Sequence, residues 1–136
     1  MRSHPEILLT SADSDRLARL TADALRRPPE VEALDEVLRT ARVVEPRDVP
    51  ANVVTMNSQV TFRDEDSQRT YDVRLVYPRE ADFANQRLSV LTPVGCALLG
   101  LREGEATEFV ARDGTRKHLR VLSVAFQPEA SGQFEL

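Results

Sequence analysis

The sequence lacks tryptophan altogether and has one cysteine, two histidines and five glycines among its 136 residues. Because there is only Cys96, a framework of internal disulfides is excluded. No run approaches the roughly 20 apolar residues that a membrane-spanning helix needs. No charged segment followed by a long apolar one opens the chain, as it would in a secretory signal. These absences predict a soluble cytoplasmic protein with no membrane partner.

An excess of positive charge is also missing. The chain has 18 Lys and Arg against 22 Asp and Glu, which gives a formal net charge of -4, and neither half is basic overall. A basic surface is the usual electrostatic footprint of a nucleic-acid-binding domain. We therefore expect no sequence-specific binding of nucleic acid.

Patterns typical of catalysis or metal binding are scarce. No His or Cys spacing matches a metal site, and no glycine-rich loop could hold phosphate. Cys96 lies near the start of a predicted helix, where the dipole could lower a thiol pKa, but the sequence offers no base to activate it. A serine with His118 and Asp113 has the residue types of a catalytic triad and no other support. We predict no catalytic residue, no metal and no cofactor.

The first 49 residues predict two helices. The segment TSADSDRLARLTADAL has helical spacing of apolar residues, with Ser11 and Asp13 as candidate N-caps. Two prolines then stop it. The segment PEVEALDEVLRTARVV, residues 29–44, predicts a second amphipathic helix that opens on Pro29. Two such helices joined by a short turn predict an antiparallel helical hairpin, a short coiled coil.

From residue 50 onward the apolar residues alternate, as in strands. Turns are expected at residues 64–67 and at Asp113–Gly114. We predict an antiparallel sheet of about five strands with one short helix, which Thr92 caps and Pro93 opens. The fold class is therefore α+β, with a helical-hairpin domain at 1–49 and a sheet domain at 50–136.

Four segments of the second domain resemble a known family. They are VVTMNSQVTFRD (53–64), VYP (76–78), LSVLTPVGCALLGLREGE (88–105) and FQPEASGQFEL (126–136). In this order and spacing they resemble the regulator of nucleoside diphosphate kinase family, often called Rnk, and more distantly the Gre transcript-cleavage factors. The resemblance covers nearly all of residues 50–136 and implies an FKBP-like fold for this domain.

The resemblance also implies a partner. In Gre-like proteins the globular domain docks on bacterial RNA polymerase at the rim of the secondary channel. The docking surface includes the corner between the third strand and its helix, which here consists of Leu91, Thr92, Pro93 and Val94. Gre factors resemble each other in having Asn or Asp, then Ser-Pro, at this corner, whereas here Leu91 and Thr92 precede the proline.

The hairpin tip departs further from the Gre pattern. Gre cleavage factors carry an acidic pair on a long coiled coil, and such carboxylates can help to hold Mg²⁺. The tip here carries Arg26, Arg27, Glu30 and Glu32 on shorter arms. The resemblance therefore implies a non-catalytic regulator of transcription elongation that competes with Gre factors without stimulating transcript cleavage. We interpret the link with nucleoside diphosphate kinase as indirect.

Two alternatives stay open. The chain could regulate nucleoside diphosphate kinase or another metabolic enzyme by direct contact, which co-purification with the kinase but not with polymerase would favour. An FKBP-like fold also suggests a prolyl isomerase, although a fold does not carry a function. A peptide isomerisation assay without acceleration would exclude that activity.

Overall fold

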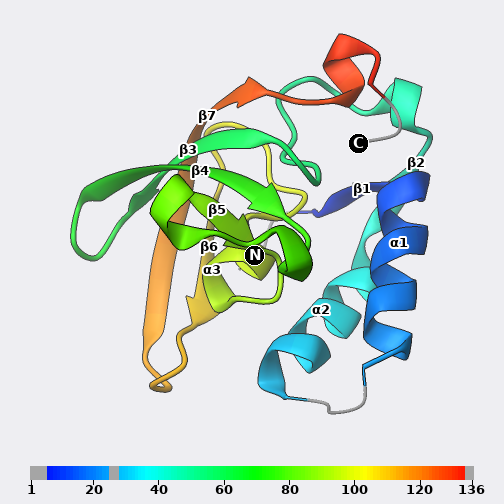
Figure 1. Cartoon of the computed structure of the whole chain (residues 1–136). Helices are drawn as coiled ribbons and strands as arrows, with labels where there is room; N and C mark the ends of the chain where they lie inside the picture. The colour runs from blue at the N-terminus through cyan, green and yellow to red at the C-terminus, as the bar shows by residue number, and fades with distance from the viewer. Residues whose placement is uncertain (1–5, 25–27, 134–136) are drawn as a thin grey trace.

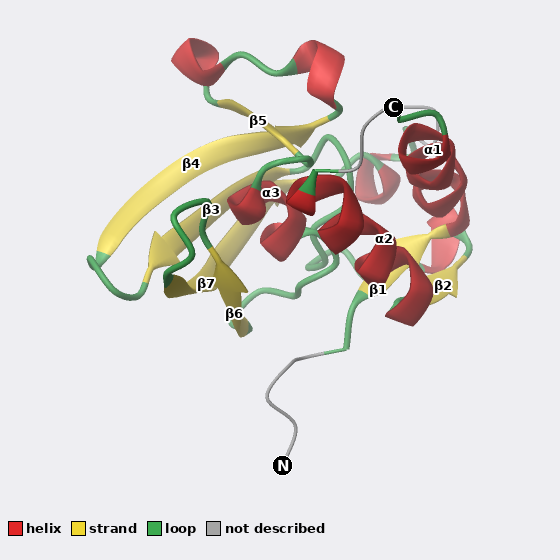
Figure 2. Cartoon of the chain, turned by 90° about the horizontal axis from the view of Figure 1, so that it is seen from below, coloured by secondary structure: helices red, strands yellow, loops and turns green. Residues whose placement is uncertain are grey.

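The computed structural model describes residues 6–24 and 28–133, in which two helices precede a curled sheet (Figures 1 and 2). The longer elements follow the order β1 (Leu8–Thr10), α1 (Ser11–Ala22), α2 (Pro29–Thr40), β2 (Arg42–Val44), β3 (Gln59–Asp64), β4 (Arg69–Val76), β5 (Arg87–Ser89), α3 (Pro93–Leu98), β6 (Ala106–Val110) and β7 (Arg116–Phe126). The predicted α+β class is confirmed. The turn that joins α1 to α2 includes residues 25–27, which lie outside the described residues.

The N-cap of helix α1 lies one residue before the first predicted candidate. Thr10, and not Ser11 or Asp13, is the N-cap, because its Oγ1 accepts a hydrogen bond from the backbone N–H of Asp13 at 3.0 Å. Thr10 is the last residue of β1 and has the extended backbone that an N-cap requires. The side chain of Asp13 is thereby left for another role.

Helix α2 ends at Thr40, so the prediction of a helix through residue 44 is wrong at its end. Ala41 adopts an extended backbone, and the N–H of Arg42 donates to the carbonyl of Ile7 at 2.8 Å. Val43 and Val44 continue as β2, which pairs in parallel with β1. Pairing with a distant strand has overridden the helical spacing. It could do so because β-branched residues such as valine have only a weak preference for the helix.

The main sheet has the strand order β5-β4-β3-β7-β6. The predicted hairpins β3–β4 and β6–β7 are confirmed, with antiparallel pairing in both. Strand β5 instead pairs in parallel with β4, so the sheet is mixed and the prediction of an antiparallel sheet is wrong at this edge. The cause is the connection over residues 77–86, which carries the chain back past β4 through two short 3-10 turns, η2 (Pro78–Glu80) and η3 (Phe83–Asn85).

One apolar core joins the helices to the sheet. Leu9, Leu17 and Leu34 come from the first 49 residues and are buried in the same cluster as residues of the sheet, of α3 and of the adjoining loops, among them Val54, Met56, Leu75, Leu98, Leu99 and Val121. Helix α2 lies between α1 and α3 and packs against both (Figure 2). The boundary between residues 49 and 50 stays a prediction, and any such boundary crosses a continuous core.

Candidate functional site

The corner between β5 and α3 is held by a dense set of local hydrogen bonds. The Oγ1 of Thr92 accepts from the N–H of Gly95 at 3.0 Å, which confirms it as the N-cap of α3. The same hydroxyl donates to the carbonyl of Ser89 at 2.7 Å, and the N–H of Leu91 donates to the Oγ of Ser89 at 3.0 Å. Pro93 occupies the first helical position, where a missing N–H costs nothing. The corner is therefore a rigid turn.

Gly95 permits this turn because no side chain would fit there. A Cβ on Gly95 would lie 2.1 Å from the carbonyl oxygen of Ser89 and 2.9 Å from the Oγ1 of Thr92. The backbone of α3 therefore approaches the end of β5 as closely as a glycine allows. Gly95 therefore serves the geometry of the corner.

The predicted docking residues lie together on this corner. Leu91, Thr92, Pro93 and Val94 are each half-buried. Leu91 and Val94 pack against the core cluster from its edge. The corner therefore combines a fixed backbone with partly accessible apolar surface, which suits binding at a low entropic cost.

Only part of the predicted hairpin tip lies among the described residues. Arg26 and Arg27 lie outside the described residues. Glu30 and Glu32 lie in the first turn of α2, where acidic side chains favour the helix dipole. The Oε1 of Glu30 accepts a hydrogen bond from the Nε of Arg112 at 3.1 Å. Since Arg112 belongs to the β6–β7 turn, this contact links the start of α2 to the end of the main sheet.

Cys96 is a core residue and not an exposed thiol. It is buried on α3, and burial raises the pKa of its thiol to about 11. A neutral, buried thiol is a poor nucleophile. The side chains of the suggested triad have other partners: the ring of His118 pairs with Asp66 and Glu108, and the carboxylate of Asp113 accepts a hydrogen bond from Thr115.

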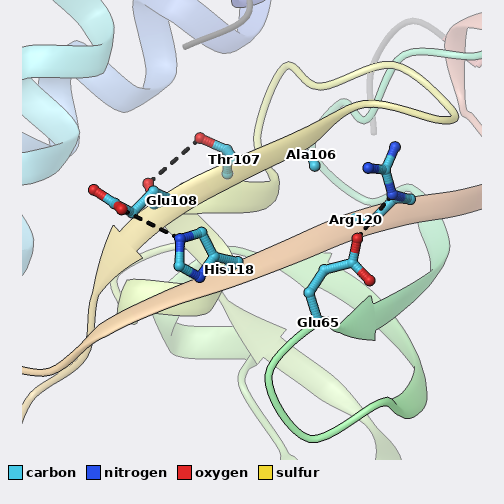
Figure 3. A pocket seen from close by; sticks show the side chains of 6 residues that line it. All are labelled: Glu65, Ala106, Thr107, Glu108, His118 and Arg120. Carbon is cyan, nitrogen blue, oxygen red and sulfur yellow. Dashed lines mark hydrogen bonds and ion pairs between the residues drawn. The ribbon is translucent and has the colours of Figure 1, made fainter. Parts of the chain in front are cut away.

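A polar hollow on the β6–β7 face contains His118 (Figure 3). His118 Nδ1 lies 3.3 Å from the Oδ1 of Asp66, and His118 Nε2 lies 3.2 Å from the Oε2 of Glu108. The hydrogen bond to Asp66 is the main cause that raises the pKa of His118. Glu65 lines the hollow too and is hydrogen-bonded to Arg63 and Arg120, which lowers its pKa. Such hydrogen bonds between groups of opposite charge are typical of a surface network.

The structure reveals one buried polar site that the sequence reading missed. Asp13 on α1 is 2% exposed, and its Oδ2 accepts from the N–H of Met56 at 3.1 Å. Burial is the main cause that raises the pKa of Asp13 to about 7; the carboxylate of Glu129 acts in the same direction, while the N–H of Met56 and Arg16 oppose the shift. The sequence did indicate that Asp13 is buried, because Asp13 lies four residues before Leu17 on the apolar stripe of α1.

Neither a metal site nor a membrane segment emerges from residues 6–24 and 28–133. No group of three or more His, Cys, Asp or Glu side chains in those ranges could hold a metal ion. None of the helices described there is long and apolar enough to cross a membrane.

Comparison with known proteins identifies the family of the chain. The family model for the transcription elongation factor GreA/GreB C-terminal region matches residues 49–126, which include the corner. The chain is 38% identical over 135 residues to the regulator of nucleoside diphosphate kinase of Escherichia coli (strain K12), covering 98% of this chain and 99% of that protein. It is 32% identical over 84 residues to transcription elongation factor GreA of Clostridium beijerinckii, covering 62% of this chain and 52% of that factor.

A solved structure shares the fold. The chain superposes on the prokaryotic transcription elongation factor GreA/GreB from Nitrosomonas europaea with a TM-score of 0.71 and 37% sequence identity. The match covers 90% of this chain and all of that one.

Proposed function

The chain belongs to the GreA/GreB-like family that includes the regulators of nucleoside diphosphate kinase, and from this membership we propose that it is a non-catalytic regulator of transcription elongation that binds RNA polymerase. The docking site is the rim of the secondary channel, and the corner Leu91–Val94 makes the contact. By occupying the rim, the chain competes with Gre factors.

The observation that carries this proposal is the rigid corner within the matched family region. Thr92, Ser89 and Gly95 hold the turn by hydrogen bonds and close backbone approach, so the surface is formed before binding. A preformed surface loses little conformational entropy on association.

The described part of the tip supports the absence of cleavage stimulation. Glu30 is engaged by Arg112, so this carboxylate is held against the globular part. Helix α2 has 12 residues, which corresponds to only about 18 Å at 1.5 Å per residue. A short arm held in this way is poorly suited to deliver a carboxylate to a distant Mg²⁺ in the polymerase.

The test is binding of the labelled chain to purified core RNA polymerase, with an unlabelled Gre factor as competitor. We expect saturable binding that the Gre factor displaces, and no increase in transcript cleavage when the chain is added to stalled complexes. Pro93→Ala should weaken binding, because alanine is accepted at the first turn of α3 while the ring surface is lost. Pro50→Ala, at an exposed proline elsewhere, is the matched control. Absence of binding at micromolar concentration would refute the proposal.

A second candidate function is direct regulation of nucleoside diphosphate kinase. The full-length match to a protein named as a regulator of that kinase favours it. A pull-down with the purified kinase distinguishes the two functions. Retention of the kinase together with failure to bind polymerase would support the second.

A further inference from the structure

The loop before β5 exposes a large aromatic side chain. Phe83 in η3 is 85% exposed, the highest value among the large hydrophobic residues that the structure describes. The other exposed hydrophobic residues lie between 40% and 60%. An isolated exposed apolar residue is common, so Phe83 matters only if its surroundings point to a partner.

The loop that carries Phe83 is rigid. Asp82 and Arg87 exchange both backbone hydrogen bonds, at 3.0 Å and 2.9 Å. The N–H of Gln86, which has a left-handed backbone with φ +60°, donates to the carbonyl of Phe83 at 3.0 Å. The Nδ2 of Asn85 donates to the Oδ2 of Asp82 at 2.6 Å. An aromatic residue on a rigid loop binds with little loss of entropy, as hot-spot residues do.

Two arginines lie beside this loop without acidic partners. Arg87 on β5 is in register with Arg74 on β4. The guanidinium of Arg74 lies over the ring of Phe126, 5.3 Å from its centroid, which fixes its position. Among residues 6–24 and 28–133, neither arginine has a carboxylate within ion-pair distance. Adjacent like charges of this kind favour an acidic surface on a partner.

Strand β5 connects the arginines and the aromatic to the corner along the chain. Strand β5 has three residues, Arg87 to Ser89, and the corner follows at once. At about 3.3 Å per residue, β5 spans roughly 10 Å between the loop that carries Phe83 and the corner. A stable interface buries on the order of 800 Å² on each partner, which is more than four half-buried residues supply. The docking surface must therefore extend beyond the corner.

We propose that Phe83, Arg87 and Arg74 form the second half of the polymerase-docking surface, along the β5 edge of the sheet. Phe83 inserts into an apolar socket, and the two arginines face carboxylates of the polymerase. This inference rests on the proposed function and adds the chemistry of the contacted surface. Edge-to-edge pairing with a second copy is disfavoured, because β5 is short and the bridge from Asp82 to Arg87 covers part of its edge.

The test compares equilibrium binding of the whole chain and its variants to core RNA polymerase. Phe83→Ser should weaken binding roughly tenfold or more, as loss of an aromatic anchor does. Arg87→Glu should weaken binding and also reduce its dependence on salt, because it removes an attraction between charges. Val110→Ser, at a 60% exposed residue of β6 on the opposite edge, is the control for Phe83. Arg69→Glu, at the far end of β4, is the control for Arg87.

The outcomes separate this inference from the function it extends. Wild-type binding that Pro93→Ala weakens, with Phe83→Ser and Arg87→Glu both within twofold of wild type, overturns the β5 surface and leaves the proposed function intact. No binding by the wild-type chain overturns both. A wild-type dimer in sedimentation that Phe83→Ser dissociates, with unchanged polymerase binding, would assign Phe83 to self-association and overturn the inference. Thermal unfolding checks that each variant folds.

Discussion

The carboxylate of Asp13 on α1 accepts a hydrogen bond from the backbone N–H of Met56, 43 residues later in the chain, at 3.1 Å. This contact joins the first helix to the segment that leads into β3. Both residues are buried, so the bond lies out of reach of water. Thr10 caps the helix in place of Asp13, which leaves this carboxylate to serve the long-range contact.

The first prediction concerns the pH dependence of stability. Burial raises the pKa of Asp13 from 3.8 to about 7, with Glu129 raising it and Arg16 and the N–H of Met56 opposing the shift. A raised carboxyl pKa means that the folded state holds its proton more tightly than the unfolded state. The Asp13 contribution to the free energy of unfolding is therefore largest below pH 4 and falls, by on the order of a few kcal/mol, as the pH rises toward 7.

Asp13→Asn tests this prediction. The amide oxygen can still accept from Met56, and the side chain stays neutral at every pH. We expect the variant to be more stable than the wild type at pH 8 and equal to it near pH 4, as measured by urea denaturation across the range. Asp15→Asn, at an exposed residue of the same helix, should leave the pH profile unchanged. The assignment would be contradicted if the free energy of unfolding of the wild type rose between pH 4 and 7 and Asp13→Asn removed that rise.

The second prediction concerns the core shared by helices and sheet. Leu34 on α2 is fully buried in the cluster that includes Leu98 and Leu99. Truncation to alanine removes buried apolar surface and leaves a cavity, so Leu34→Ala should lower the free energy of unfolding by about 2–5 kcal/mol. Because the core is continuous, unfolding should stay a single transition when followed by both far-UV circular dichroism and tyrosine fluorescence.

The control for Leu34 is Val43→Ala, since Val43 is 48% exposed on β2. It should change stability by less than about 0.5 kcal/mol, as surface substitutions usually do. Two separate transitions in Leu34→Ala would show instead that residues 1–49 and 50–136 unfold independently. That result would favour the two-domain division over a single cooperative unit.

The elements that the sequence predicted correctly are those with local causes. Asp113–Gly114 suits a tight turn, and Thr92 with Pro93 starts α3, because each depends on a few neighbouring residues. Two of the errors, β2 and the direction of β5, depend on partners elsewhere in the chain. Whether Val43 joins a helix or pairs with Leu9 is decided by tertiary contact, which periodicity does not record.

The geometry of the corner was predictable to the same degree. Its cap at Thr92 and its helix start at Pro93 followed from a local motif, while its role in docking stays a prediction that the resemblance implies. Phe83 and Arg87 gave no signal, because exposure of a side chain depends on how the loop folds over its neighbours. Asp13 did give one, as an acidic residue on an apolar stripe, although its partner Met56 could be identified only in three dimensions.

The third prediction concerns the glycine of the corner. A Cβ at Gly95 would lie 2.1 Å from the carbonyl oxygen of Ser89, so Gly95→Ala must displace α3 from β5. We expect a loss of about 1–3 kcal/mol in the free energy of unfolding, as for overpacking. Polymerase binding should weaken as well, because the corner shifts.

Gly104→Ala separates the two effects. Gly104 has φ +86°, and nothing lies within 4 Å of the position its Cβ would take. The left-handed backbone alone should cost about 1–2 kcal/mol. If Gly104→Ala lowers stability but retains polymerase binding, loss of binding in Gly95→Ala is due to the corner. Equal loss of binding in both variants would show that the effect comes from stability alone.

The fourth prediction concerns the ionisation of His118. Its Nδ1 faces the Oδ1 of Asp66 at 3.3 Å, which is the main cause that raises the pKa of His118 above 6.5, and Glu108 adds to it from Nε2 at 3.2 Å. Because the folded pKa is raised, the stabilisation is present in full below the unfolded value and is lost as the pH rises through the folded value. NMR titration of the ring protons should therefore give a pKa above 6.5 in the wild type, a clear decrease in Asp66→Asn, and a smaller decrease in Glu108→Gln. A larger decrease in Glu108→Gln than in Asp66→Asn would show that Glu108 is the dominant partner.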